Sequence, residues 1–119
     1  MAWTIVIVDD HPTFRRFVRR LLEQAGFEVV GEAGDGGTAL SSVPELAPDV
    51  VLLDVMLPDM SGVEVAEQLA SCAPSVRVVL TSSRSAEDLA IDSRGDGVPF
   101  VCKDDLPTEV FGDLLGGGE

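Results

Sequence analysis

The chain is poor in basic residues and in soft metal ligands. Only 8 Lys and Arg face 21 Asp and Glu, which gives a net charge of -13. Such a charge repels nucleic acid phosphates, so we expect no direct nucleic acid binding by this chain. With one His and two Cys there are too few nitrogen and sulfur ligands for a zinc site of the usual kind.

Long apolar runs are also missing. The longest, Ile5 to Val8 and Val50 to Leu53, are far too short to cross a bilayer, and the N-terminus lacks the charged start of a signal peptide. We therefore expect a cytoplasmic protein without a membrane segment. In that compartment Cys72 and Cys102, which both lie in apolar stretches, are predicted to be buried free thiols.

Short β-branched runs alternate along the 119 residues with stretches of helical period. Strands are predicted at Thr4 to Asp10, Phe27 to Ala33, Val50 to Asp54, Arg77 to Thr81 and Pro99 to Lys103. Helices are predicted at Pro12 to Gly26, Gly37 to Leu46, Val63 to Cys72, Ala86 to Asp92 and Thr108 to Leu115. This (βα)5 order predicts one doubly wound α/β domain over residues 1–115, with a five-stranded parallel sheet and helices on both faces. Residues 116–119 are expected to form a flexible tail.

The helical patterns also predict where a helix is interrupted and which of its faces is buried. Pro44 predicts a break or a late start in the second helix. In the third helix the predicted buried side is Val63, Ala66, Leu69 and Ala70. In the first helix it is Phe14, Phe17, Val18, Leu21 and Leu22. The opposite face, with Arg15, Arg16, Arg19 and Arg20, is predicted to be solvated, with a patch that docks a partner as the alternative.

Polar residues gather where the predicted strands end. Asp9 and Asp10 end the first strand, Asp54 the third, Thr81 the fourth and Lys103 the fifth. Because the carboxyl ends of parallel strands meet at one sheet edge, the three carboxylates would repel each other there unless a hard divalent cation such as Mg²⁺ were bound. A hydroxyl and an ammonium beside that ion would bind phosphoryl oxygens, and a carboxylate can act as the nucleophile.

These motifs and their spacing resemble the receiver family of bacterial two-component response regulators. The likeness is carried by VVLLDVMLPDMSG, VVLTSS and the N-terminal DDHPTFRRFVRRLLEQAGFEVVGEAGDG, which is similar to the branch that precedes helix-turn-helix output domains. The resemblance implies a flavodoxin-like sandwich. It also implies a role for each of seven residues: Asp54 as phosphoacceptor, Asp10 as direct and Asp9 as water-mediated Mg²⁺ ligand, the Met56 carbonyl as a further ligand, Thr81 as switch hydroxyl, Phe100 as switch aromatic, and Lys103 as phosphate-binding lysine.

The function implied by the resemblance is that of a switch. Asp54 would take a phosphoryl group from a sensor histidine kinase in a Mg²⁺-dependent reaction, and the domain would assist its own phosphorylation and dephosphorylation without being an enzyme in the usual sense. The changed conformation would control an output domain, a downstream protein or a phosphorylation-dependent homodimer.

Other interpretations fit the sequence less well. An aspartate-nucleophile phosphatase needs a second acid at position 56, which is Met, and GEAGDGG lacks the spacing of a dinucleotide-binding loop. A receiver that acts only as an interaction module is disfavoured because every phosphorylation residue is present. His11 is interpreted as a solvated loop residue. The segment Arg94 to Pro99 departs from the family pattern, and Gly112 weakens the last helix, so the route of signal output stays open.

Overall fold

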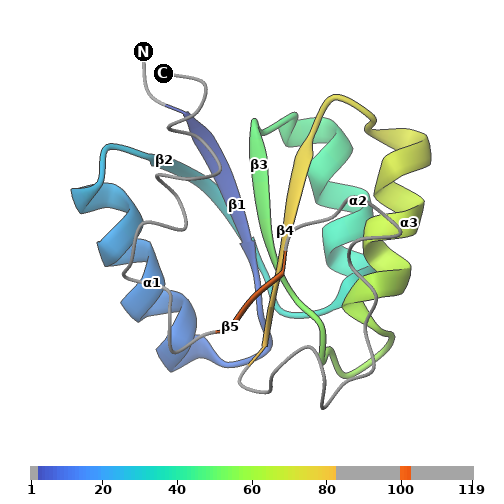
Figure 1. Cartoon of the computed structure of the whole chain (residues 1–119), viewed down its shortest axis with the longest axis horizontal. Coiled ribbons are helices and arrows are strands. Elements are labelled where there is room, and N and C mark those ends of the chain that lie inside the picture. Colours follow the sequence, from blue (N-terminus) through green and yellow to red (C-terminus); the bar gives the residue numbers. More distant parts are fainter. Residues whose placement is uncertain (1–2, 83–99, 103–119) are drawn as a thin grey trace.

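The computed structural model describes residues 3–82 and 100–102, the last three as backbone only. Its strands are β1 (Thr4–Val8), β2 (Glu28–Ala33), β3 (Val50–Asp54), β4 (Arg77–Ser82) and β5 (Phe100–Cys102). Its helices are α1 (Pro12–Gln24), α2 (Gly36–Leu46) and α3 (Gly62–Cys72). All strand pairs are parallel, in the order β2-β1-β3-β4-β5. The predicted flavodoxin-like α/β fold is confirmed (Figure 1).

Alternation along the central strands creates two cores. Val6, Val51 and Leu53 face one side of the sheet, where they pack with residues of α2 and α3. Ile5, Val50 and Leu52 face the other side and pack with Val18 and Leu22 of α1. Since strand residues project alternately to opposite faces, an uninterrupted apolar strand such as β3 must be covered on both sides.

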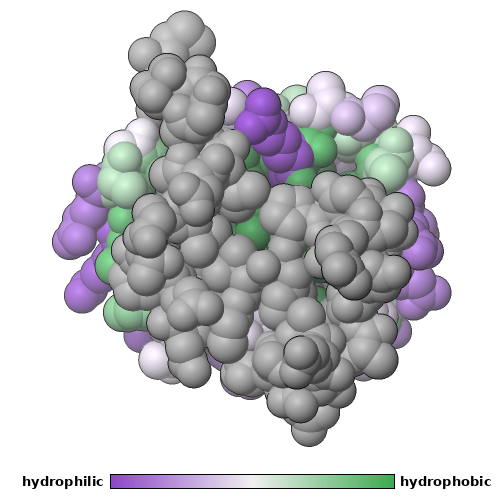
Figure 2. All heavy atoms as spheres, viewed as in Figure 1, coloured by the Kyte–Doolittle hydropathy of each residue, from purple (hydrophilic) through white to green (hydrophobic). Residues whose placement is uncertain are grey.

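The helices cover the sheet as this pattern requires. Figure 1 shows α1 on one face and α2 with α3 on the other, while β1, β3 and β4 run toward the same lower edge of the view. In Figure 2 hydrophilic residues project at both flanks of the molecule, and hydrophobic residues appear between them. No helix of the described part of the chain is long and apolar enough to cross a membrane.

Most predicted boundaries agree within two residues. β1 ends at Val8, so Asp9 and Asp10 follow the strand instead of belonging to it. α1 ends at Gln24, and Gly26 has a φ of 100°, a left-handed conformation that glycine adopts without strain. The predicted helices Ala86 to Asp92 and Thr108 to Leu115, the segment Arg94 to Pro99, Gly112 and the tail at 116–119 lie outside the described residues.

The prediction that Pro44 breaks or delays the second helix is wrong. α2 runs without interruption from Gly36 to Leu46. Pro44 lies two residues before the end, so it removes only one late helical hydrogen bond. The preceding residue, Val43, is fully buried and its carbonyl accepts the N–H of Ala47 at 2.8 Å, which closes the helix.

Two expectations about α3 are corrected. Its buried side consists of Gly62, Val65, Ala66 and Leu69, whereas Val63 is half-buried and Ala70 is exposed. The observed buried face of α3 is therefore rotated around the helix axis by part of a turn from the predicted one. Cys72 is a free thiol as expected, but it is exposed, because it belongs to the solvent side of the last turn. The side chain of Cys102 lies outside the described residues.

Candidate metal centre

The carboxyl ends of three neighbouring strands position the buried polar groups of the site. Asp9 follows β1, Asp54 ends β3 and Thr81 lies in β4, with relative exposures of 1%, 2% and 1%. The backbone N–H of Asp9 donates to the carbonyl of Ala33 at 2.9 Å, which extends the β1–β2 pairing up to the site. Buried carboxylates are rare without a partner or a metal, so this edge of the sheet is the candidate functional site.

Asp54 sits at the start of a tight loop. Its Oδ1 accepts the N–H of Met56 at 3.1 Å, while the neighbouring Val55 N–H donates to the carbonyl of Thr81 at 2.9 Å. Val55 also accepts the N–H of Gly62 at 2.7 Å, and a Cβ on Gly62 would meet the Asp54 carbonyl oxygen and lie 2.8 Å from the Cα of Val55. The loop can close this tightly only because residue 62 has no side chain.

Four side chains converge in this region. Carboxylate oxygens of Asp9, Asp10 and Asp54 and a ring nitrogen of His11 all lie within 4.8 Å of one another. Asp10 is 34% exposed and His11 is 68% exposed, so the cluster is buried on one side and open to solvent on the other. Three carboxylates at this spacing form a hard oxygen donor set of the type that Mg²⁺ and Ca²⁺ prefer.

Arg15 holds the loop that carries the acidic residues. One guanidinium nitrogen donates to the backbone carbonyl of Asp9, and Nε donates to Glu32 Oε1 of β2 at 3.0 Å. Arg19 donates to Glu32 Oε2 at 2.6 Å. The expectation that the arginine face is simply solvated is therefore wrong for Arg15 and Arg19, because Glu32 on the neighbouring strand lies within reach of both.

The same contacts act on the Glu32 carboxyl. Burial raises its pKa, but the hydrogen bonds from Arg19 and Arg15 outweigh burial, and the pKa stays below the ordinary value. Glu32 is thus a charged anchor, and through Arg15 it links β2 to the backbone of Asp9, one of the carboxylates of the acidic cluster. Sequence periodicity did not reveal this link, since it depends on which strand lies beside α1.

Asp59 fixes the other side of the loop after β3. Its carboxylate accepts the N–H groups of Gly36 and Gly37 at 2.8 and 2.9 Å, at the first turn of α2. These backbone hydrogen bonds lower the pKa of Asp59. The start of α2 also receives a cap from Asp35, whose Oδ1 accepts the N–H of Thr38 at 2.7 Å. In the sequence this contact could be suspected only from two separate features: an acidic residue in the loop after β3, and a Gly-Gly pair at the start of the second helix.

Of the remaining predicted residues, some lie within the described part of the chain and others lie outside it. Met56 is 52% exposed and forms an isolated antiparallel bridge with Ser61. Phe100 lies in β5 as the Cα partner of Leu80, but its side chain is outside the described residues. Lys103 lies outside the described residues. The structure brings together Asp9, Asp10, Asp54 and Thr81, whereas the expected role of Lys103 rests on the sequence alone.

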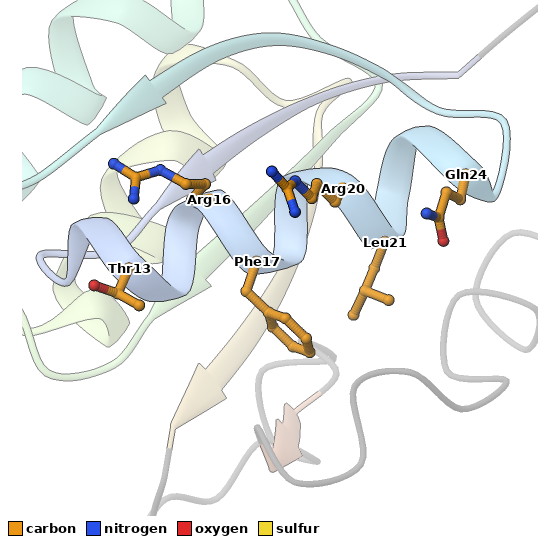
Figure 3. Close-up of a pocket in the computed structure, with 6 residues that line it drawn as sticks. All are labelled: Thr13, Arg16, Phe17, Arg20, Leu21 and Gln24. Carbon is orange, nitrogen blue, oxygen red and sulfur yellow. The ribbon is translucent and has the colours of Figure 1, made fainter.

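A groove of about 410 Å³ lies along α1 and is separate from the acidic site. Figure 3 shows Phe17 and Leu21 projecting from the same side of the helix, with Arg16 and Arg20 above them. Thr13 and Gln24 complete its lining, and no member of the acidic cluster lines it. Phe17, predicted to be buried, is 52% exposed, because the α1 positions against the sheet are taken by Val18 and Leu22.

Comparison with known proteins assigns the chain to a family of phosphoacceptor switches. Residues 5–104 match the family model described as the response regulator receiver domain, and the chain belongs to this family. Receiver domains are phosphoacceptor switches that bind Mg²⁺ at their acidic pocket, and the cluster around Asp9 and Asp54 has the donor set for such an ion. Domains of this type work with histidine kinases and output domains.

The relatives include proteins of about the same length as this chain and longer ones. The chain is 38% identical to the nitrate/nitrite response regulator protein NarP of Escherichia coli, with 97% of this chain and 54% of that protein covered. It is 29% identical to the chemotaxis protein CheY of Thermotoga maritima over 92% of both chains. It thus spans about half the length of NarP and nearly the full length of CheY.

Solved structures agree with the same fold. The receiver domain of the putative response regulator NarL from Mycobacterium tuberculosis has a TM-score of 0.85 at 36% identity, covering 98% of this chain and 95% of that one. A LuxR-family response regulator from Aurantimonas has a TM-score of 0.87 at 30% identity, covering 98% of this chain and 87% of that chain.

Proposed function

We propose that Asp54 is the residue that accepts the phosphoryl group. The observation that carries this proposal is the position of Asp54: 2% exposed, at the end of the central strand, within 4.8 Å of two further aspartates and in register with Thr81. A carboxylate oxygen of Asp54 attacks phosphorus, the P–N bond to the histidine of a sensor kinase breaks, and the departing imidazole nitrogen keeps the electron pair. The product is an aspartyl phosphate.

The proposed ligands of Mg²⁺ are Asp10 directly, Asp9 through water, Asp54, and the backbone carbonyl of Met56. When bound, the ion neutralises charge on the phosphoryl oxygens. The three carboxylates hold it, and the hydrogen bond from Met56 N–H fixes one oxygen of Asp54, which orients the other toward the incoming phosphorus.

We further propose that Thr81 and Lys103 bind the phosphoryl oxygens. Thr81 is supported by its in-register position beside Asp54, and Lys103 by its place directly after β5. Movement of Thr81 and Phe100 then shifts a pre-existing equilibrium between two conformations. The changed surface acts on an output domain, a downstream protein or a second copy of the chain, and the chain itself binds no DNA.

Phosphotransfer from candidate kinases and from acetyl phosphate tests the acceptor. The wild type is expected to gain one acid-labile and base-labile phosphoryl group in the presence of Mg²⁺, and Asp54→Asn none. Asp49→Asn is a matched control, because Asp49 precedes the opposite end of the same strand. A phosphorylated Asp54→Asn variant would show that the acceptor is another residue.

A further inference from the structure

A single guanidinium group connects three segments beside the acidic site. Nη1 of Arg15 donates to the backbone carbonyl of Asp9, and Nε donates to Glu32 Oε1 of β2 at 3.0 Å. A Cβ built on Gly34 would lie 3.5 Å from the same Nη1, so the guanidinium also lies against the turn that follows β2. Arg15 of α1 is therefore placed between the loop that carries the first two aspartates and the end of the neighbouring strand.

The two hydrogen bonds of Arg15 depend on the shape of its guanidinium group. Nη1 and Nε belong to one rigid plane and donate in different directions, so a carbonyl oxygen and a carboxylate oxygen are held in a fixed relative position. The side chain of Arg15 is 20% exposed and that of Glu32 is 28% exposed, so most of the contact is shielded from solvent. A lysine ammonium on its flexible stem keeps the charge but lacks this planar fork.

The carbonyl that Arg15 contacts belongs to the peptide between Asp9 and Asp10. A peptide unit is planar, so a hydrogen bond to its carbonyl also fixes the direction in which the next residue leaves the backbone. The N–H of Asp9 is already tied to the Ala33 carbonyl at 2.9 Å. The Asp10 side chain is 34% exposed, so burial does not hold it as it holds Asp9. Arg15 thus restrains the more exposed carboxylate of the cluster through its backbone.

We infer that Arg15 is a positioning residue of the acidic site: anchored on Glu32, it holds the peptide between Asp9 and Asp10 so that both carboxylates are in place before an ion binds. The inference rests on the proposed function, because both concern one site. Groups that are already ordered bind with a smaller entropic cost, so removal of Arg15 weakens Mg²⁺ binding. Its hydrogen bonds go to Asp9 and Glu32, so it acts through the ligands, and phosphoryl transfer at saturating Mg²⁺ depends little on it.

Arg19 supplies a matched control on the same helix. It donates to Glu32 Oε2 at 2.6 Å and to Glu23 Oε2 at 3.1 Å, and neither contact involves the Asp9 carbonyl. Arg19→Ala therefore takes a cation away from Glu32, as Arg15→Ala does, but keeps the hydrogen bond to the site. Calorimetric titration is expected to show about a tenfold loss of Mg²⁺ affinity in Arg15→Ala and less than about a twofold change in Arg19→Ala. Arg15→Lys is expected to resemble Arg15→Ala, because the charge returns without the fork.

Two further readouts separate positioning from a general loss of stability. In the metal-free, ¹⁵N-labelled protein, the backbone order parameters of Asp10 and His11 are expected to fall from the rigid value of about 0.85 toward about 0.6 in Arg15→Ala, and to stay unchanged in Arg19→Ala. With acetyl phosphate as donor, Arg15→Ala is expected to need about tenfold more Mg²⁺ for half-maximal phosphorylation and to reach nearly the wild-type rate at saturation. A purely structural residue would lower the melting temperature and leave the Mg²⁺ affinity of the folded protein unchanged.

Three results would overturn the inference. One is an unchanged Mg²⁺ affinity and backbone order in Arg15→Ala. Another is an equal loss in Arg19→Ala, because the ion pairs of Glu32 would then matter instead of the contact with the Asp9 carbonyl. The third is full rescue by Arg15→Lys, since a positive charge would then suffice. Backbone order and Mg²⁺ affinity are measured without a phosphodonor, so a wild type that takes up no phosphoryl group would contradict the proposed function and still leave the role of Arg15 to be decided by these two measurements.

Discussion

Asp54 and Thr81 are Cα partners on the neighbouring parallel strands β3 and β4, and both are buried. The N–H of Val55 donates to the carbonyl of Thr81 at 2.9 Å, so the pairing continues one residue past the end of β3. Residues in register on adjacent strands project to the same face. A group attached to Asp54 is therefore next to Thr81, with little freedom in the backbone between them.

Thr81→Ala tests whether this hydroxyl transmits the change. We expect the variant to bind Mg²⁺ and take up beryllofluoride, while amide chemical shifts beyond the acidic site change much less than in the wild type. Ser82→Ala is the matched control, because Ser82 is equally buried but projects to the opposite face. Equal responses of the Thr81→Ala variant and the wild type would remove Thr81 from the switch.

Magnesium should stabilise the fold by relieving repulsion among the carboxylates. At ten times the dissociation constant the gain is about 1.4 kcal/mol, which raises the melting temperature by roughly 6 °C for a domain of this size. Asp10→Asn should melt higher than the wild type without metal and lose most of the Mg²⁺ effect. Calorimetric scans at matched ionic strength measure both. An unchanged metal-free melting temperature in Asp10→Asn would contradict the repulsion argument.

Gly62 should be intolerant of any side chain. A Cβ there would collide with the Asp54 carbonyl and lie 2.8 Å from the Cα of Val55, so Gly62→Ala is expected to cost about 2 to 4 kcal/mol and to impair phosphorylation. Gly37→Ala is the matched control, since its Cβ would have no neighbour closer than 3.5 Å. Urea unfolding compares them. Equal free energies of unfolding for the two variants would mean that the loop after β3 relaxes easily.

Asp59 should make stability depend on pH in the acid range. The N–H groups of Gly36 and Gly37 hold its folded-state pKa below 3.8, so the charged form stabilises the fold above the ordinary pKa. This contribution is lost as pH falls below 3.8 and through the lowered pKa. Asp59→Ala should therefore melt below the wild type at neutral pH, with a difference that shrinks in strong acid. Glu67→Ala, an exposed change on α3, is the matched control. A difference that is independent of pH would contradict the capping role.

The sequence predicts which residues lie together at the candidate site when these residues stand at the ends of strands. Asp9, Asp54 and Thr81 follow or end buried apolar strands, and parallel pairing brings such ends together whatever the loops do. The pattern of apolar runs likewise predicts the alternation of five strands with helices and the burial of β3 on both faces. The link from Asp59 to α2 and the pair formed by Arg15 and Glu32 could not be found in this way, because they join segments whose spacing in space depends on packing.

The errors have a common physical origin. The predictions for Pro44, Cys72 and Phe17 rest on local pattern alone. Pro44 lies so late in α2 that the helix continues past it, and Cys72 and Phe17 lie at the end or on the flank of a helix, where the neighbouring layer decides burial. His11, predicted to be a solvated loop residue, is 68% exposed, so that prediction is confirmed. Its ring nitrogen also lies 3.0 Å from Asp10 Oδ1, a contact that a single histidine in the sequence does not reveal.

β2 is an edge strand of the sheet, and its open side could pair with another chain. Glu28 and Glu32 are exposed on it, and its register with β1 shifts between Ile5 and Val6. Charged side chains and an irregular register both oppose the addition of a further strand. In a chain with a net charge of -13, these two features together oppose filament growth by addition of strands at β2.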